Sequence, residues 1–218
     1  MPPTKPIIIG TRGSDLALWQ ANFVRKELER LGHQVHIKMI TTQGDKIQDL
    51  GFDKMEGKGF FTKEIEAALL KRDIDLAVHS HKDLETKQPE GLEVAAVSAR
   101  ENPCELLLIR ESAYQENALW GLRKDAVVGT SSARRKSQLL ALRQDVQIKE
   151  LRGNVPTRVE KLRSGQYDAI LLAKAGILRL KLDLSGLVSI DLTPDEFVPA
   201  PAQGVLALQI RSVDTELQ

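Results

Sequence analysis

Residues Asp75-Leu-Ala-Val-His-Ser-His-Lys-Asp83 form the stretch that decides the fold. Its apolar first half predicts a short buried strand, and this strand ends in a run of ionisable side chains. Open α/β sheets place ligand chemistry at the carboxyl ends of their parallel strands. The position of Asp83 directly after such a strand therefore indicates a binding or catalytic carboxylate. The alternative is that Lys82 and Asp83 only cap the following turn.

Strand-like and helix-like segments alternate along the rest of the chain. Apolar runs predict strands at residues 7–10, 35–40, 106–109, 126–128 and 168–173. Amphipathic spacing predicts helices that begin near Ser14, Phe61, Ser132 and Pro156, and a last helix that ends near Leu180. Such alternation is typical of α/β domains with parallel sheets. No internal repeat is evident in the sequence.

The first predicted helix has a capping residue and an apolar stripe. The Ser14 hydroxyl is expected to accept a first-turn N–H, and Gly32 is expected to end the helix. Near-helical spacing predicts one buried stripe that consists of Leu16, Trp19, Phe23, Leu28 and Leu31. Trp19 is therefore expected in the core. Phe61 is expected there too, although its ring could instead contact an aromatic ligand.

Composition narrows the functional classes. The 218 residues are 42% hydrophobic and 28% charged with a formal net charge of +1, which suits one large or two small globular domains. A near-neutral charge and 4% aromatic residues argue against nucleic acid or an anionic membrane as a partner. No apolar run reaches the ~20 residues of a membrane helix, and the amino terminus is not signal-like. A single cysteine fits a reducing compartment, so we expect a cytoplasmic protein, acting as a monomer.

Five further motifs accompany the Asp75–Asp83 stretch in a fixed order. They are Gly10-Thr-Arg-Gly-Ser-Asp-Leu-Ala-Leu-Trp-Gln20, Gly57-Lys-Gly-Phe-Phe-Thr-Lys63, Val128-Gly-Thr-Ser-Ser-Ala-Arg-Arg135, Leu151-Arg-Gly-Asn-Val-Pro-Thr-Arg158 and Pro199-Ala-Pro-Ala-Gln-Gly204. Together they closely resemble the hydroxymethylbilane synthases, also called porphobilinogen deaminases, of tetrapyrrole biosynthesis. The resemblance runs from about Ile7 to the last residues without large gaps.

The resemblance implies a more specific architecture than the pattern alone. Pattern alone divides the chain near residue 100 into two domains of about equal size. The family implies an α/β fold of two lobes like type II periplasmic binding proteins, with mixed, mostly parallel sheets and a ligand cleft between the lobes. Residues 1–100 and 196–218 would form the first domain and residues 101–195 the second. The segment from Phe197 to Ile210 would thus rejoin the first domain.

The resemblance also implies a reaction. Members of the family join four porphobilinogen units head to tail and release ammonia at each condensation. Asp83 matches the family's catalytic aspartate. A fixed carboxylate can hold pyrrole N–H groups, stabilise the cationic azafulvene-type species that forms at each step, and handle a proton.

Pyrrole units carry acetate and propionate arms, which guanidinium groups bind well because they grip a carboxylate with two hydrogen bonds. The resemblance assigns substrate or cofactor binding to Arg12, Ser14, Lys58, Lys82, Ser132, Arg134, Arg135, Arg152, Arg158 and Arg179. Cations at a helix start oppose the helix dipole, so an anionic ligand would resolve a conflict at Arg134 and Arg135. For Arg179, a solvated surface position is an equally good interpretation.

The sequence departs from the family at the cofactor site. Family members continue into a third, small domain whose cysteine holds a dipyrromethane cofactor, and neither is present in these 218 residues. The only cysteine, Cys104, is interpreted as a half-buried structural thiol. We therefore expect no covalent attachment residue here, and a primer would have to be held noncovalently.

Smaller departures lie near Asp83. His81, Ala202 and Gln209 stand where the family commonly has methionine, glycine and glutamate. His79 and His81 alternate with Asp83 on an extended chain, but His79 belongs to the family pattern without a metal, so no metal site is expected. His81 could tune the nearby carboxylate near neutral pH.

Two alternatives stand beside a condensing enzyme. A non-catalytic paralogue would keep the arginine-lined cleft and bind porphobilinogen or a linear tetrapyrrole. A piece of a longer protein would end as this sequence does, at residues 214–218, which are typical of the opening of a helix. In each case the expected partners are small pyrrole carboxylates.

Overall fold

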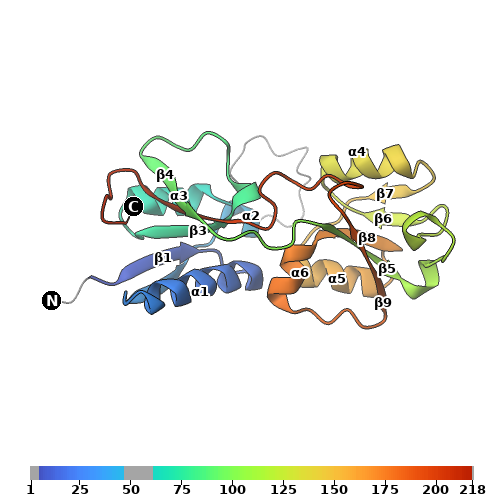
Figure 1. Cartoon of the computed structure of the whole chain (residues 1–218), viewed down its shortest axis with the longest axis horizontal. Coiled ribbons are helices and arrows are strands. Elements are labelled where there is room, and N and C mark those ends of the chain that lie inside the picture. Colours follow the sequence, from blue (N-terminus) through green and yellow to red (C-terminus); the bar gives the residue numbers. More distant parts are fainter. Residues whose placement is uncertain (1–4, 47–60, 218) are drawn as a thin grey trace. The chain divides into compact units, whose positions relative to one another are not determined.

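The computed structural model describes residues 5–46 and 61–217, and their contacts divide the chain into two compact units (Figure 1). Unit 1 comprises Met1–Glu101 and Ala202–Gln218, and unit 2 comprises Asn102–Pro201. The chain thus leaves unit 1 once and returns to it. Each unit is an α/β structure built on a five-stranded mixed sheet.

Unit 1 has five strands, three helices and one 3₁₀ turn among its described residues. The strands are β1 (Ile7–Thr11), β2 (Val35–Met39), β3 (Leu76–Ser80), β4 (Leu92–Val97) and β10 (Leu206–Arg211). The helices are α1 (Asp15–Arg30), α2 (Gln43–Lys46) and α3 (Lys63–Leu70), and the 3₁₀ turn is η2 (His81–Asp83). In the order β2-β1-β3-β10-β4, β1 is parallel to β2 and β3, whereas β10 is antiparallel to β3 and β4.

The isoleucines of β1 show how this sheet is covered. Ile7 and Ile9 pack in one core cluster with Ala21 and Val24 of α1. Ile8 packs against a second cluster, which contains the buried side chains of α3. Successive side chains of a strand point to opposite faces, so α1 and α3 cover opposite faces of the sheet.

Unit 2 repeats this plan with its own elements. Its strands are β5 (Glu105–Arg110), β6 (Val127–Gly129), β7 (Gln147–Lys149), β8 (Ala169–Ala173) and β9 (Leu187–Leu192). Its helices are α4 (Ala133–Leu142), α5 (Val155–Arg163) and α6 (Lys174–Leu180), with 3₁₀ turns η3 (Glu111–Ala113) and η4 (Leu119–Gly121). The order is β7-β6-β8-β5-β9, in which β6 is parallel to β7 and β8, and β5 is antiparallel to β8 and β9.

The core of unit 2 again lies on both faces of its sheet. Leu107 of β5 packs in one cluster with Leu139 of α4. The next strand residue, Leu108, packs in another cluster with Val159 and Leu162 of α5. Half of the strand pairs in each sheet are antiparallel, so the sheets are mixed rather than mostly parallel.

The apolar stripe expected on the first helix is wrong in its orientation. The buried residues of α1 are Gln20, Ala21 and Val24, whereas Phe23 is 41% exposed. Trp19 is only partly buried and stacks on Phe23, with ring centroids 5.6 Å apart. Small side chains let the helix approach the sheet closely, and the aromatic rings lie on its flank. In α4 likewise, Leu139 is buried as expected but Leu142 is half exposed.

The return from unit 2 to unit 1 occurs later in the chain than the expected residue 196. Phe197 is fully buried in the core of unit 2, where its ring lies edge-on to Trp120 at a centroid distance of 6.0 Å. The chain enters unit 1 only at Ala202. Phe197 therefore belongs to unit 2, because burying an aromatic ring there is strongly favourable.

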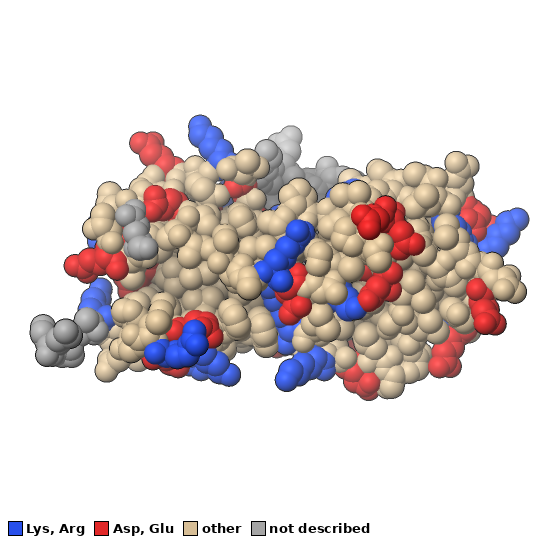
Figure 2. All heavy atoms as spheres, viewed as in Figure 1, with Lys and Arg blue, Asp and Glu red and all other residues tan. Residues whose placement is uncertain are grey.

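Two surface properties bear on partners. On the face shown in Figure 2, lysine and arginine side chains lie among aspartate and glutamate side chains, as the net charge of +1 suggests. Across residues 5–46 and 61–217, no helix combines the length and the apolar character needed to cross a bilayer.

Candidate functional site

The carboxyl ends of β1 and β3 lie side by side in unit 1. β1 ends at Thr11 and is followed by Arg12, and β3 ends at Ser80 and continues through η2 to Asp83. From β1 the chain goes to β2 on one side and later to β3 on the other, which makes the position between β1 and β3 a topological switch point. Open α/β sheets bind ligands at such points.

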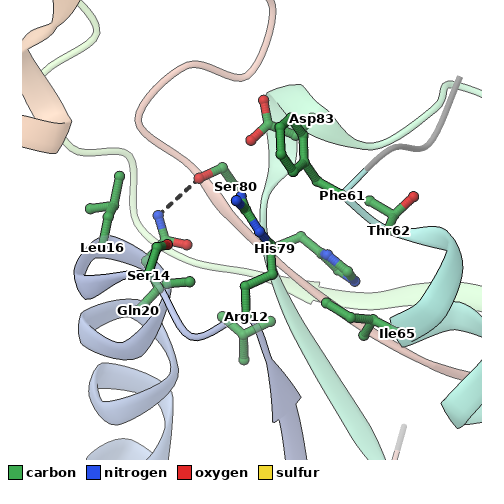
Figure 3. A pocket seen from close by; sticks show the side chains of 12 residues that line it. Arg12, Ser14, Leu16, Gln20, Phe61, Thr62, Ile65, His79, Ser80 and Asp83 are labelled. Atoms are coloured by element: carbon green, nitrogen blue, oxygen red, sulfur yellow. Dashed lines mark hydrogen bonds between the residues drawn. The ribbon is translucent and has the colours of Figure 1, made fainter. Parts of the chain in front are cut away.

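A pocket of about 80 Å³ opens at this switch point (Figure 3). Its lining consists of Arg12, Ser14, Leu16, Ala17, Gln20, Phe61, Thr62, Ile65, Val78, His79, Ser80 and Asp83. The Ser80 hydroxyl accepts a hydrogen bond of 2.8 Å from the Gln20 amide of α1. A guanidinium, a carboxylate and an imidazole on a partly apolar wall suit a small ligand that carries both carboxylate and N–H groups.

Arg12 is held from two sides. Its Nε and Nη2 donate to Oδ1 of Asp45 in α2, at 3.0 and 2.5 Å, and its guanidinium carbon lies 4.1 Å from the centroid of the Phe61 ring. Burial alone raises the pKa of Asp45, but hydrogen bonds from Arg12 and Thr42 outweigh it and hold that pKa below its usual value. The side chains of this ion pair are about a quarter exposed. A ligand carboxylate at the pocket can therefore compete with Asp45 for the guanidinium.

Asp83 lies on the exposed turn η2 and lines the same pocket as Arg12. Its neighbour Lys82 donates from Nζ to Oε1 of Gln203 at 3.2 Å. The turn that follows β3 thus carries a carboxylate at the pocket and a lysine that donates a hydrogen bond to the segment before β10. This geometry satisfies the expectation that the ionisable run follows a buried strand, because four of the five residues of β3 are buried.

Two pocket residues differ from their sequence-based interpretation. Ser14 is the N-cap of α1, but its hydroxyl makes no capping hydrogen bond, and the residue lines the pocket. Phe61 precedes α3 instead of lying on its apolar face, and its partly exposed ring lines the pocket beneath Arg12. The aromatic-ligand interpretation of Phe61 fits this position better than the core interpretation.

His79 is a buried, neutral imidazole at the pocket. Its side chain is on the α3 face of β3, and its Nε2 lies 3.2 Å from Oε1 of Gln209 on β10. Burial lowers the pKa of His79 to about 4, and the hydrogen bond with Gln209 offsets this only in part. Within the described ranges, no three His, Cys, Asp or Glu side chains form a group that could hold a metal ion.

The switch point of unit 2 lies between β6 and β8. β6 is followed by a hydroxyl-rich turn and α4, where Ser132 is the N-cap and accepts a hydrogen bond from the Arg135 N–H at 3.4 Å. The Thr130 hydroxyl accepts the Ser132 N–H at 3.2 Å. The turn therefore satisfies part of its own donors at the helix start.

Glu105 resolves the charge conflict at the start of α4. Its fully buried carboxylate accepts hydrogen bonds from Arg134 and from Arg135, the latter at 2.7 Å. Burial alone raises the pKa of Glu105, but the two guanidinium groups outweigh it and lower that pKa. An anionic ligand is thus not required to balance these arginines, contrary to the sequence-based argument. Of the Arg135 N–H groups, Nε has no partner among the described residues.

The other site residues predicted from the sequence are likewise divided between the two units. Arg152 lies 3.6 Å from Glu150 just after β7, and Arg158 in α5 donates from Nε to Gly153 O at 2.7 Å. Arg179 is buried in the last turn of α6, which excludes a solvated surface position. Lys58 lies outside the described residues. Unit 1 thus holds the predicted Arg12, Ser14, Lys82 and Asp83, and unit 2 holds Ser132 with five arginines.

Sequence reasoning missed two anionic partners. Asp45 could have been found from Thr42-Gln-Gly-Asp45, since a Thr followed three residues later by an acidic residue is typical of a helix start, and Asp45 indeed accepts the Thr42 N–H at 3.1 Å. Glu105 has no local signal. It contacts arginines 29 and 30 residues away because β5 lies beside β8.

Comparisons with solved structures bear on the fold. An ancestral arginine-binding protein bound to arginine superposes with a TM-score of 0.53 at 15% identity, covering 99% of this chain and 88% of that one. An ancestral cationic amino acid solute binding protein gives a TM-score of 0.56 at 16% identity, covering 97% and 84%. The fold is therefore that of the two-lobed type II periplasmic binding proteins.

Comparisons of sequence bear on the family. The family model described as "Porphobilinogen deaminase, dipyromethane cofactor binding domain" matches residues 7–218. The porphobilinogen deaminase of Maridesulfovibrio salexigens is 51% identical over 216 residues, which are 98% of this chain and 68% of that protein. That of Nitratiruptor is 46% identical, covering 94% and 65%, and the chloroplastic enzyme of Euglena gracilis is 44% identical, covering 98% and 45%. The chain spans about two thirds or less of the length of these relatives, and it belongs to the porphobilinogen deaminase family.

Proposed function

We propose that this chain condenses porphobilinogen units stepwise, head to tail, as a hydroxymethylbilane synthase-type transferase of tetrapyrrole and haem biosynthesis. The observation that carries the proposal is that Arg12 and Asp83, predicted from separate motifs, line one pocket at the β1–β3 switch point. Membership of the porphobilinogen deaminase family supports the same reaction.

Each condensation breaks one bond and forms another. The C–N bond of the aminomethyl group breaks and ammonia leaves, which creates a cationic azafulvene. A pyrrole carbon of the next unit then attacks the exposed methylene, a C–C bond forms, and the attacked carbon loses its proton. Asp83 is positioned at the pocket to stabilise the positive charge and to accept a pyrrole N–H, because a fixed carboxylate needs little reorganisation in the transition state.

Arginines would bind the carboxylate arms of the substrate. Arg12 is the candidate in unit 1, since its partner Asp45 is partly exposed and Phe61 keeps the guanidinium plane in place. Ser14 offers a hydroxyl that the helix cap does not use. In unit 2, Ser132 and the arginines that follow it are proposed as a second set of carboxylate-binding residues.

The family model names a dipyromethane cofactor, and the residues of the chain fit the acidic arms of such a group. When bound, a dipyrromethane supplies the pyrrole carbon to which the first unit is joined. Arg12 would hold one of its carboxylates. Cys104 is half buried beside the start of β5, so we propose no attachment there. We place the reaction in the cytoplasm because a single cysteine suits a reducing compartment.

Turnover of porphobilinogen tests the proposal. The purified chain is expected to consume porphobilinogen and to yield porphyrin after acidification and oxidation, measured by absorbance. Asp83→Asn should remove this activity, by more than about a hundredfold, and leave the far-ultraviolet circular dichroism unchanged. Asp214→Asn, an acidic residue at the far end of β10, is the control and should keep full activity.

Two outcomes would contradict the proposal. Full turnover by Asp83→Asn would overturn the role of this carboxylate. Tight porphobilinogen binding without consumption, in a well-folded sample, would favour a non-catalytic binding protein with the same pocket.

A further inference from the structure

The turn η2, which carries the carboxylate of the pocket, is anchored to the segment by which the chain returns to unit 1. The turn itself contains no buried residue. The N–H of its first residue, His81, donates to the Val205 carbonyl oxygen at 3.0 Å. The ammonium group of Lys82 donates to Oε1 of Gln203 at 3.2 Å. Both hydrogen bonds end on residues 202–205, which we call the return segment.

The return segment is held on its other side by the residues at which the chain leaves unit 1. The Gln203 carbonyl oxygen accepts a hydrogen bond of 2.9 Å from Arg100 Nε. The Gly204 carbonyl oxygen accepts the Glu101 N–H, also at 2.9 Å. Gln203 is fully buried, with 0% of its surface exposed. Its Oε1 is therefore an acceptor with a fixed position, because packing and backbone hydrogen bonds restrict the residue that carries it.

The hydrogen bond to Gln203 determines where the Lys82 side chain points. A lysine has a flexible four-carbon stem, and an exposed one samples many conformations unless its ammonium group is bound. Lys82 and Asp83 are adjacent in a 3₁₀ turn, which has three residues per turn, so their side chains leave it about 120° apart. The ammonium group lies at the return segment, and the Asp83 side chain lines the pocket (Figure 3).

Two anchors restrict the turn more than one does. The backbone hydrogen bond of His81 fixes where the turn leaves β3, whereas the Lys82 hydrogen bond fixes it one residue before Asp83. A hydrogen bond from a charged donor is stronger than one between neutral groups, so the second anchor is a substantial constraint on an exposed turn. A carboxylate that stabilises developing charge must be held in place before the reaction, and this constraint serves that need.

We propose that Gln203 is a positioning residue: by accepting a hydrogen bond from Lys82, it fixes the η2 turn on the return segment and keeps the Asp83 carboxylate at the pocket. This inference deepens the proposed function and rests on it, because Asp83 is the carboxylate proposed to stabilise the azafulvene. Gln203 acts through Lys82 and does not itself contact the reacting atoms.

The amide of Leu84 reports the order of the turn without any ligand. It donates to the His81 carbonyl oxygen at 3.1 Å and closes η2. Gln203→Met keeps an unbranched side chain of similar length but replaces the amide with a thioether, which is a weak acceptor. Hydrogen exchange at Leu84, measured by NMR, should become about tenfold faster in this variant, while exchange in β3 stays unchanged. Equal acceleration in the turn and in β3 would overturn the positioning role in favour of a purely structural one.

A double-mutant cycle tests whether Gln203 acts through Lys82. Lys82→Met removes the donor at an exposed position and should accelerate exchange at Leu84 as much as Gln203→Met does. Combining the two substitutions should add nothing, and Lys82→Arg should retain the slow exchange. Additive effects would overturn the proposal, as would slow exchange at Leu84 in Lys82→Met, which decides the question even where Gln203→Met does not fold.

Gln34→Met is the matched control for the loss of a glutamine amide. Gln34 is exposed and directly precedes β2, whose first residue lies beside the first residue of β1, at the opposite end of the sheet from η2. This variant should leave exchange at Leu84 unchanged. A tenfold acceleration in Gln34→Met as well would overturn the assignment of the effect to the Lys82 hydrogen bond.

Turnover separates the positioning role from the proposed function. Gln203→Met should lower kcat for porphobilinogen about tenfold, keep KM within about twofold and leave the far-ultraviolet circular dichroism unchanged, because Asp83 acts in the transition state. An unchanged kcat despite faster exchange at Leu84 would overturn the catalytic consequence of the anchor. Absence of turnover by the unsubstituted chain would overturn the proposed function, whereas the exchange cycle would still decide whether Gln203 orders the turn.

Discussion

Unit 1 and unit 2 build their sheets in the same order and with the same strand directions. β1 corresponds to β6, β2 to β7 and β3 to β8, and these strands are parallel. β10 corresponds to β5 and β4 to β9, and these pairings are antiparallel. Both units therefore have a switch point at the same place, although no repeat is evident in the sequence.

The two switch points differ in the burial of the carboxylate that pairs with their arginines. β5 begins with Glu105 opposite Ala173, so a fully buried carboxylate meets the arginines at the start of α4. The equivalent strand of unit 1 begins with Leu206 opposite Ser80, and Arg12 pairs instead with the partly exposed Asp45. A buried pair contributes to the fold of its unit, whereas a partly exposed pair can exchange its carboxylate for that of a ligand.

Among the substitutions that test this comparison, Arg135→Ala is expected to have the largest effect on stability. It would leave Glu105 buried beside a single remaining arginine and lower the free energy of unfolding of unit 2 by about 3–5 kcal/mol. Each unit contains one of the two tryptophans, Trp19 and Trp120, so the Trp19→Phe background reports unit 2 by fluorescence during urea unfolding.

Arg12→Ala, measured in the Trp120→Phe background, is the control for unit 1. Its ion pair is partly exposed, so the loss of stability should stay at about 1 kcal/mol or less. Equal losses in the two units would remove the distinction between a structural and an exchangeable arginine.

Mild acid is expected to affect unit 1 before unit 2. All four histidines lie in unit 1, and burial lowers the pKa of His79 from 6.5 to about 4. Below pH 6.5 the unfolded chain binds a proton that folded His79 does not, so stability falls with pH, by about 3 kcal/mol when pH 4 is reached.

Unit 2 should respond only at lower pH. The folded pKa of Glu105 is depressed, so its stabilising contribution is present above the usual value of 4.5 and is lost as pH falls through the folded pKa. Urea unfolding at several pH values, followed by each tryptophan alone, measures the two dependences. His79→Gln should flatten the response of unit 1; a steep response of unit 2 above pH 5 would contradict the assignment.

The smallest expected effect concerns the two points where the chain crosses between units. On the return, Ala202 has a left-handed backbone with φ of +55°, and two residues later a Cβ on Gly204 would lie 2.3 Å from the Glu101 carbonyl oxygen. Ala202→Gly should relieve backbone strain and raise the free energy of unfolding by about 0.5–1 kcal/mol, visible as a higher Tm. Ala200→Gly, where φ is not positive, should lower it; the same gain at both positions would argue against strain at Ala202.

Sequence pattern predicts much of the secondary structure because strands and helices have local causes. The apolar residues of β1, β3, β5 and β8 are contiguous, and Asn154 with Pro156 marks the start of α5, where Asn154 accepts the Thr157 N–H. The motif residues Arg12 and Asp83 meet at one pocket because each follows one of two adjacent parallel strands. The family could be recognised from the same motifs.

Tertiary structure decided which helix faces are buried and which polar and charged side chains contact one another. Hydrophobicity favours Trp19 and Phe23 for the core, yet Gln20 is buried instead, because its amide donates to the Ser80 hydroxyl 60 residues away. The pairing of Glu105 with Arg134 and Arg135 and the contact between His79 and Gln209 likewise depend on strand order. Contacts between residues distant in the chain are set by the packing of whole elements, and a single sequence carries no local signal for them.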